Sequence, residues 1–257
     1  MAANFLVIND DKTHLVVAGS SCSRRVQSAR KEEVIKAGNS TIRPSKTETL
    51  LGCQISEDLK WKEHLLLGDK SMVKQLTSRV NGMSMISHNA TFDTKLMVAN
   101  GIVMSKLSYL IQLWGGCEGY LLNALQIIQN RAARVVTGQG MFTPVGKLLL
   151  DCNWLSVRQL VFFQTVVLVH KSIGSGSPVY LNRRLSTFHP YPTRQSFNGS
   201  IRFSESFPSH KQLSHDSFFY RGTKEYNQIP ASIRSSKSLN IFKSKLKIWI
   251  KNNVSID

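Results

Sequence analysis

The stretch LLNALQIIQNRAARVVTG, residues 121–138, constrains the fold most strongly, because its apolar residues have the clearest helical spacing in the chain. They recur at alternating intervals of four and three residues, which places them on one stripe of an α-helix. These residues are Leu121, Leu125, Ile128, Ala132 and Val135. Gly138 follows where a C-terminal cap belongs. The sequence therefore predicts an amphipathic helix that ends at Gly138.

The other side of this predicted helix is polar and basic. Asn123 and Asn130 lie mostly away from the apolar stripe, and Arg131 and Arg134, three residues apart, share one exposed side. One interpretation is a solvated face on a helix that packs in a core. The other is a surface that follows a nucleic-acid backbone, and this interpretation depends on the rest of the chain.

The charge of the chain favours the second interpretation. The 257 residues carry a formal net charge of +17 and have a sequence pI near 10.0. This excess goes well beyond what solubility requires and implies a polyanionic partner, with nucleic acid favoured over an anionic membrane surface. The length predicts one large domain or two small ones, and no repeat of fixed period is visible.

The cysteines and the apolar stretches indicate a soluble intracellular protein. The four cysteines lie far apart, with neither a C-x-x-C pair nor a nearby His cluster, so we expect reduced thiols and no zinc knuckle. They are Cys22, Cys53, Cys117 and Cys152. The N-terminus lacks the features of a signal peptide, and the apolar stretch 160–169 is too short to cross a bilayer. We expect a nuclear or cytoplasmic location and no membrane partner.

Short β-rich runs dominate the first part of the chain. Residues 5–19 predict a hairpin, and Asp10 and Asp11 at its tip are either turn formers or carboxylates that hold metal ions. Residues 20–33 are polar and basic and predict an exposed loop.

Two more strand predictions follow this loop. The runs VIKAG and STIR predict a strand pair that turns at Gly38-Asn39. Residues 49–56 predict a further strand. Gly52 within that strand marks a bulge or a close approach of another backbone, or it is an unremarkable glycine that weakens the strand.

Three helices are predicted after the strands. The first begins at an N-cap, Ser56, and runs to about Ser87 with an interruption at Gly68 and Asp69. The second covers residues 93–114 and ends at a Gly pair, and the third is the amphipathic helix described above. Short connections between helices favour antiparallel neighbours, so we expect a small helical bundle.

Further helices are predicted toward the C-terminus. Pro144 can open a short helix, and Ser156 caps a helix that is apolar nearly all round and ends at Gly174. The Gly, Ser and Pro residues of 174–178 form the best candidate linker. Residues 186–216 show no clear period and predict a loop with short strands.

The chain closes with a predicted basic helix that Ser238 caps. Phe242, Leu246 and Ile250 form its apolar stripe. Much of its remaining surface carries Lys243, Lys245, Lys247 and Lys251. Such a helix could bind a membrane surface or nucleic acid, or it could dock by its stripe while the lysine stems lie along the protein.

Four separated strings resemble one family, in the correct order. Residues 9–19, NDDKTHLVVAG, resemble the Asn-x-x-Lys-Thr box of non-LTR retrotransposon reverse transcriptases. Residues 50–65 are similar to the Leu-Gly primer-grip segment and the first thumb helix of that family. Residues 121–138 resemble its Leu-Gln-x-x-Gln-Asn-Arg-Ala-Ala-Arg thumb signature. Residues 217–247 resemble its Asn-x-x-Pro-x-x-Ile-Arg and Phe-Lys-x-x-Leu-Lys tail.

The resemblance implies an RNA-directed DNA polymerase, although this chain by itself is expected to be inactive. In that family, the metal-binding aspartates lie in two palm motifs upstream of the Asn-x-x-Lys-Thr box, and neither motif occurs here. Met1 aligns just past the second motif, and Asp10 and Asp11 align with variable positions before Lys12. We therefore expect no metal site in this chain, with Mg²⁺ implied only for an intact polymerase. Whether the chain acts as an enzyme stays open.

The resemblance also assigns roles to individual residues. Lys12 matches the motif lysine that stabilises the leaving group in an intact enzyme, and the alternative is an exposed turn lysine. Leu51 and Gly52 match the primer grip. The residues that would follow the phosphates of a template-primer duplex are Lys60, Lys62, Lys74, Arg79, Arg131 and Arg134.

The expected fold class is α+β and mainly α, with N-terminal β-hairpins, a helical thumb bundle and a C-terminal helical extension. The expected divisions are trailing palm hairpins with the primer grip at 1–57, the thumb at 58–140 and the extension at 141–257.

Two functions follow from this organisation. In the first, the chain is the C-terminal part of a mobile-element reverse transcriptase that grips an RNA-DNA or template-primer duplex, with its polyprotein's palm and fingers as further partners. In the second, it is a stand-alone basic module that binds RNA, DNA or protein without chemistry. Neither function has a small-molecule substrate bound by this chain alone.

Overall fold

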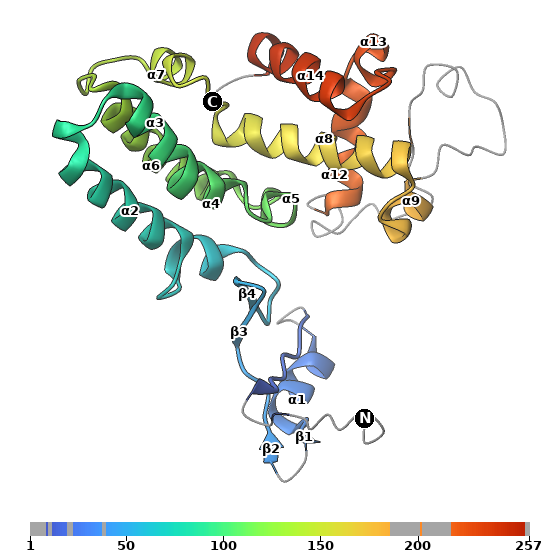
Figure 1. Cartoon of the computed structure of the whole chain (residues 1–257). Coiled ribbons are helices and arrows are strands. Elements are labelled where there is room, and N and C mark those ends of the chain that lie inside the picture. The colour runs from blue at the N-terminus through green and yellow to red at the C-terminus, as the bar shows by residue number, and fades with distance from the viewer. Residues whose placement is uncertain are drawn as a thin grey trace. The chain divides into compact units, whose positions relative to one another are not determined.

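The computed structural model describes residues 9, 12–19, 23–37, 40–185, 201 and 217–254 (Figure 1). It confirms the predicted class: two small antiparallel hairpins near the N-terminus precede a helical remainder, so the chain is α+β and mainly α. The chain divides into two compact units, Met1–Gln75 and Leu76–Asp257. The threefold division expected from the sequence stays a prediction.

Helix α1 (Arg24–Glu32) replaces the exposed loop predicted for residues 20–33, so that prediction was wrong for the described residues of the segment. The segment RRVQSARKE consists largely of good helix formers, and its apolar face is small, with only Val26 and Ala29. It also ends with Arg30 and Lys31 in the last turn, where cations favour the helix dipole. Propensity and local charge therefore explain this helix better than periodicity does.

Strands β1 (Ile35–Ala37) and β2 (Ser40–Ile42) pair in antiparallel register, with Ala37 opposite Ser40. This pairing confirms the predicted hairpin, while its turn residues 38–39 lie outside the described residues. The predicted hairpin at 5–19 also lies mostly outside them. In its described part, residues 12–19, Leu15 forms an isolated β-bridge with Pro44.

Residues 47–56 form a second hairpin and not the single strand predicted for 49–56, which was wrong. Strand β3 (Thr47–Leu50) pairs with β4 (Cys53–Ser56), and Leu50 lies opposite Cys53. The two loop residues, Leu51 and Gly52, have φ angles of 49° and 76°. Consecutive positive φ angles are typical of the tight turns that join twisted antiparallel strands. Gly52 is therefore a turn residue and not a bulge.

The helix predicted from Ser56 begins later. The Ser56 hydroxyl donates to Asp58 Oδ1 (2.6 Å) and to the Lys60 carbonyl (2.8 Å), so it closes a turn and does not cap a helix. A short π-helical segment, η3 (Glu63–Leu67), follows, and α2 begins only at Met72 and ends at Ile86. The predicted interruption at residues 68–69 is confirmed.

Residues 92–114 form a helical segment that is broken near its end. It comprises α3 (Phe92–Ala99), the π-helical η5 (Asn100–Met104), α4 (Ser105–Ser108) and α5 (Ile111–Trp114), after a short 3₁₀ turn, η4 (Ser87–Asn89). Leu110 has a φ of 53°, which interrupts the helix. The fully buried residues Ala99, Val103, Leu107 and Ile111 keep a spacing of four across the break, and Leu110 itself is half-buried.

Helix α6 (Gly119–Thr137) confirms the prediction with which the sequence analysis began, and Gly138 ends it with a φ of 69°. Four of the five predicted stripe residues are buried, but Val136 is buried in place of Val135. The buried surface is broader than the stripe and comprises Leu121, Leu122, Leu125, Ile128, Gln129, Ala132, Ala133 and Val136.

Helix α8 (Val157–Ser175) contacts α5, α6, α12 and α14 (Figure 1). Ser156 and Gln159 form a capping box at its start, and it ends at Gly176, slightly later than predicted. The remaining described helices are α7 (Val145–Asp151), α9 (Val179–Arg184), α12 (Phe218–Gln228), α13 (Ala231–Arg234) and α14 (Leu239–Asn253).

Helix α14 is capped by Ser238 as predicted, and its stripe of Phe242, Leu246 and Ile250 is fully buried. The helix therefore packs on the protein through its apolar stripe, as one of the interpretations of the sequence expected. The predicted loop at 186–216 lies outside the described residues, apart from Ile201. Within the described part of the chain, no helix is both long and apolar enough to cross a membrane.

Candidate nucleic-acid interface

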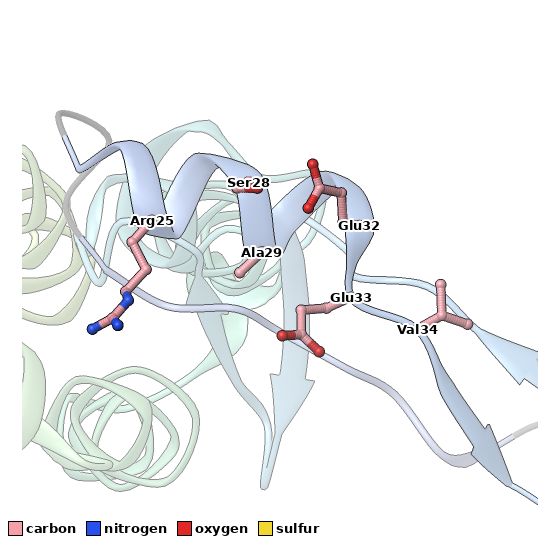
Figure 2. Close-up of a pocket in the computed structure, with 6 residues that line it drawn as sticks. All are labelled: Arg25, Ser28, Ala29, Glu32, Glu33 and Val34. Carbon is pink, nitrogen blue, oxygen red and sulfur yellow. The ribbon is translucent and has the colours of Figure 1, made fainter.

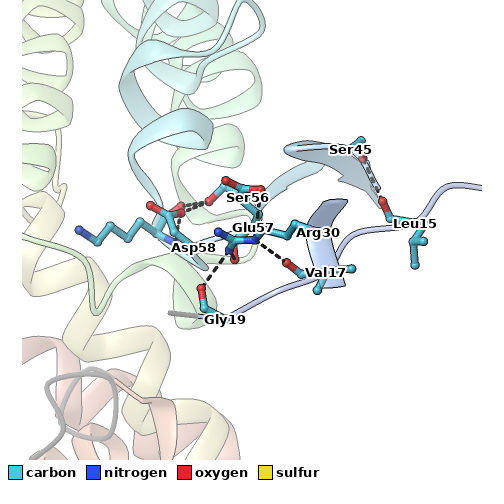
Figure 3. Close-up of polar contacts among 9 residues, drawn as sticks. Leu15, Val17, Gly19, Arg30, Ser45, Ser56, Glu57 and Asp58 are labelled. Carbon is cyan, nitrogen blue, oxygen red and sulfur yellow. Dashed lines mark hydrogen bonds and ion pairs between the residues drawn. The ribbon is translucent and has the colours of Figure 1, made fainter. Parts of the chain in front are cut away.

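Arg30 is the centre of the polar contacts in Met1–Gln75 (Figure 3). Its Nη2 donates to the carbonyls of Glu57 (2.6 Å) and Gly19 (3.0 Å), and its Nε donates to the Val17 carbonyl (3.1 Å). The Glu57 carboxylate lies 3.3 Å from Arg30 Nε. Only 13% of the Arg30 side chain is exposed, so this guanidinium fastens α1 and residues 17–19 to the end of the β3–β4 hairpin.

Lys12 lies in a short turn within the same unit. Its N–H donates to the Asn9 side-chain oxygen at 3.2 Å, and the Thr13 hydroxyl donates to the Asn9 carbonyl at 2.9 Å. The Lys12 side chain is exposed. The two aspartates that precede Lys12 lie outside the described residues.

Leu51 and Gly52 form the exposed tip of the β3–β4 hairpin, where 79% of Leu51 is accessible. Behind the tip, the Gln54 N–H donates to Nδ1 of the buried His64 at 3.3 Å. This contact joins the second strand of the hairpin to η3. The two residues predicted as a primer grip are therefore presented on a tight turn whose base is held by hydrogen bonds.

Lys60, Lys62 and Lys74 are exposed, as a phosphate-binding role requires. Lys74 Nζ lies 3.8 Å from Asp69 Oδ1, which partly offsets its charge. Asp58 lies close to Lys60. Burial raises the pKa of Asp58, but hydrogen bonds from the Ser56 hydroxyl and the Lys60 N–H outweigh that effect and leave the pKa lowered. Lys60 therefore acts beside a carboxylate that is ionised at neutral pH.

The hollow beside α1 contributes little to such an interface (Figure 2). It is lined by Arg25, Ser28, Ala29, Glu32, Glu33 and Val34. The two carboxylates outnumber the single guanidinium, so the hollow does not attract a phosphate backbone.

Arg79, in Leu76–Asp257, is better described as a structural residue than as a phosphate ligand. Its Nη1 donates to the Ile102 carbonyl at 2.6 Å, and its side chain is only partly exposed. The bond joins α2 to η5, whose π-helical backbone places that carbonyl. The charge pattern of the sequence does not distinguish a cation that binds phosphate from one that bonds a backbone carbonyl within the protein.

Arg131 and Arg134 extend from α6 with different surroundings. Arg131 is exposed and its Nη2 donates to Asn81 Oδ1 on α2 at 3.0 Å. Arg134 is half-buried and its Nη2 donates to the Met141 carbonyl at 3.3 Å. Arg131 is therefore the predicted α6 residue best placed to contact a phosphate, while Arg134 also supports the loop after the helix.

Sequence patterns missed a set of charged residues near the start of α6. Arg158 and Arg221 line a cavity there together with Glu225. The Arg221 Nε lies 3.7 Å from Glu225 Oε1, and its Nη2 donates to the Gln112 carbonyl at 3.0 Å. Burial raises the pKa of Glu225 to about 7, although Arg221 and Lys224 oppose the rise. The i, i+4 spacing on α12 could have indicated the pair, but its burial depends on packing against other helices.

The two units differ strongly in charge. Leu76–Asp257 contains 21 Lys and Arg residues against 7 Asp and Glu, a net charge of +14, whereas Met1–Gln75 contains 12 against 9, a net charge of +3. Within the described residues, no group of three or more His, Cys, Asp and Glu side chains could hold a metal ion. Comparisons with protein-family models, with curated proteins and with solved structures found no match.

Proposed function

We propose that this chain is the nucleic-acid-gripping, C-terminal part of a non-LTR-type reverse transcriptase and that it is catalytically silent by itself. The observation that carries the proposal is the concentration of positive charge in Leu76–Asp257, a net +14. A small soluble domain needs a net charge of only about 2–8. The ordered resemblance of residues 9–19, 50–65, 121–138 and 217–247 to that family supports the identity of the polyanion as a template-primer duplex.

The grip acts through phosphates and not through bases. Arg131, Lys60 and Lys62 are exposed cations with long side chains, which suit contacts to a phosphate backbone. Such contacts release counterions and carry no sequence information. The binding is therefore tight at low salt, weak at high salt and indifferent to the duplex sequence.

The turn at Leu51 and Gly52 brings backbone to the primer end. A residue without a side chain, beside an exposed leucine at a hairpin tip, allows a close approach of backbone to a nucleotide. Lys12 adds a positive charge for the leaving group only when metal-binding carboxylates are present. In the family that the sequence resembles, those carboxylates come from palm motifs that are not in this sequence. Polymerisation therefore requires a palm and fingers as partners.

A second candidate is a stand-alone module that binds nucleic acid or protein without chemistry. The observation that favours it is that Leu76–Asp257 has its own apolar core, which includes fully buried Trp114, Leu125 and Phe242. A unit with its own core can fold without a catalytic domain. Both candidates share the grip and differ in whether a polymerase uses it.

The test is binding of the purified chain to a labelled RNA-DNA duplex across a salt series, beside a primer-extension assay with Mg²⁺. We expect log K to fall linearly with log salt and no extension. Binding that does not change with salt would contradict the phosphate grip. Extension would contradict the proposed silence and return attention to Asp10 and Asp11.

Adding a separately expressed palm and fingers domain from a non-LTR element distinguishes the two candidates. Extension that depends on this chain supports the polymerase part. Unchanged extension, with duplex binding retained, supports the stand-alone module.

A further inference from the structure

Two cavities lie next to each other along α6. The first, of about 290 Å³, is lined by Gly115 and Gly116 before the helix and by Arg158, Arg221 and Glu225 from α8 and α12. The second, of about 360 Å³, is lined by Asn123, Gln126, Ile127 and Asn130 of α6 and by Val145, the first residue of α7. Both cavities are lined by Leu122 and Arg158, so together they form a groove along the helix, which we call the α6 groove.

Arg158 is at the centre of the α6 groove. Its Nη2 donates to Asn123 Oδ1 at 3.0 Å, and a Cβ added to Gly119 would lie 3.2 Å from the same nitrogen. The guanidinium therefore lies against the first turn of α6, half-exposed, with the absence of a side chain at Gly119 leaving it room. A planar guanidinium in this position can stack on a base or contact a phosphate.

The first cavity combines apolar walls with both kinds of hydrogen-bonding group. Leu122 and Val161 are buried and form apolar walls. Arg158 supplies N–H donors. Glu225 supplies an acceptor, because its Oε2 is buried and accepts no hydrogen bond from any residue that the structure describes. A planar ligand with a carbonyl oxygen and N–H groups on one edge matches this combination, whereas a bare phosphate would meet the Glu225 carboxylate.

The second cavity extends the groove beyond the size of one base. Ile127 is 62% exposed and presents an apolar surface, while Asn130 presents an amide. Gln126 is held by three hydrogen bonds, to Gln129, Asn130 and the Val157 N–H, so it forms a fixed wall. Leu122 to Asn130 spans about 12 Å along the helix axis.

We propose that the α6 groove binds a single-stranded segment of nucleic acid and that the cavity of Arg158 and Glu225 takes one of its unpaired bases. The inference rests on the proposed nucleic-acid grip and adds a site for a single strand to it. A base inside a duplex cannot enter a cavity between helices, so the occupant is unpaired. The net charge of +14 in the unit that holds the groove complements the strand's phosphates.

The polar groups select guanine over adenine. Guanine carries a carbonyl oxygen beside two N–H donors on one edge, which match Arg158 as donor and Glu225 as acceptor. Adenine presents one donor group, its N6 amino, beside the acceptor N1, so a carboxylate that accepts two hydrogen bonds from guanine accepts only one from adenine. A good pair of such bonds contributes about 1–3 kcal/mol of discrimination, so we expect about tenfold tighter binding of guanine.

The test measures binding of the full chain to two labelled single strands, an oligodeoxyadenylate and the same strand with one central guanine. We expect the strand with guanine to bind about tenfold more tightly. Glu225→Gln and Arg158→Gln should reduce this preference to below about twofold, and circular dichroism checks that each variant folds. The matched control is Lys171→Gln, which removes one positive charge from the exposed surface of α8 and should keep the preference.

The outcomes separate this inference from the function on which it rests. Equal binding of both strands, with the salt dependence of a phosphate grip, overturns the base site and leaves the grip intact. A guanine preference that survives in both cavity variants also overturns the site. Failure to bind either strand or a duplex overturns the site together with the proposed function.

Discussion

The two compact units of this chain are held together in different ways. Among the described residues of Met1–Gln75, the buried apolar side chains are Cys53, Leu65 and Met72, and the guanidinium of Arg30 makes the most extensive polar contacts. Leu76–Asp257 buries a large apolar core around α8 and carries most of the net positive charge. The comparison shows that the unit with the larger apolar core also carries the larger net positive charge.

The largest expected effect is in the apolar core of Leu76–Asp257. Phe242 is fully buried on α14, and its ring stacks on His170 with centroids 3.7 Å apart. Phe242→Ala should lower the free energy of unfolding by about 3–5 kcal/mol, because it leaves a cavity. Chemical denaturation measures the change. The control is Ile248→Ala on the exposed side of the same helix, where we expect less than about 0.5 kcal/mol.

The next largest effect is the pH dependence of the stability of Leu76–Asp257, which Glu225 controls. The pKa of Glu225 is raised from 4.5 to about 7 by burial, so the folded state holds the proton more tightly than the unfolded state. Stability from this group is therefore present below pH 4.5, falls as the pH rises toward 7 and is then constant. The total change is about 3 kcal/mol. Among the described residues, the charged or titratable groups that shift this pKa or line the same cavity are Arg221, Lys224, Arg158 and Cys117.

Unfolding of the wild type and of Glu225→Gln, measured between pH 5 and pH 8, checks this expectation. The variant has no carboxyl at this position, so the difference in stability between the two proteins should change across the range. His170, whose pKa is lowered by burial, contributes equally to both proteins and cancels. In Met1–Gln75, the shift of the Asp58 pKa has the opposite sign. This pKa is lowered, so the contribution of Asp58 to stability is lost as the pH falls. A constant difference would contradict the burial of Glu225.

A smaller effect is expected for Arg30. Arg30→Gln removes three hydrogen bonds to carbonyls and the ion pair with Glu57, at a cost of about 2 kcal/mol. Because these contacts lie within Met1–Gln75, hydrogen exchange should accelerate at the amides of Gly19 and Glu57, which donate to backbone carbonyls there. The matched control, Arg25→Gln on the exposed side of α1, should leave both amides unchanged. Equal acceleration in both variants would contradict the role of Arg30.

The smallest stability effect concerns the hairpin tip. Leu51 has a φ of 49°, which a leucine adopts at a cost of about 1 kcal/mol. Asn before Gly is the favoured pair in such a turn, so Leu51→Asn should raise the stability of the hairpin by about 1 kcal/mol or less. If the exposed leucine takes part in the grip, the same variant should weaken duplex binding. A gain in stability with unchanged binding would assign the tip a structural role only.

Local signals predicted the elements whose ends are marked in the sequence. Gly138 ends α6, and Ser156 and Ser238 begin α8 and α14, because caps satisfy backbone groups with nearby residues only. Helix α1 was missed because only Val26 and Ala29 mark its apolar face, and the bonds of Arg30 that hold it come from residues far away in the chain. The break at Leu110 was missed because no Gly or Pro marks it in residues 105–114.

The candidate interface was predicted only in part, for a related reason. Charge patterns indicate which residues are cationic but not whether a guanidinium is already bonded within the protein. Arg79 therefore resembled Arg131 in the sequence, although only Arg131 remains well exposed. The cavity of Arg158 and Glu225 combines α8 with α12, two helices separated by residues 176–217 of the chain, and only the packing of the helices brings them together.

The most direct test of the central claim is the salt dependence of duplex binding by Arg131→Gln and by Arg25→Gln. Each variant removes one exposed guanidinium. Arg131 lies in Leu76–Asp257, which has a net charge of +14, and Arg25 lies in Met1–Gln75, which has a net charge of +3. If Arg131 grips a phosphate, its loss should reduce the slope of log K against log salt by about 0.9, while the loss of Arg25 leaves the slope unchanged. Equal slopes in both variants would contradict a phosphate contact by Arg131.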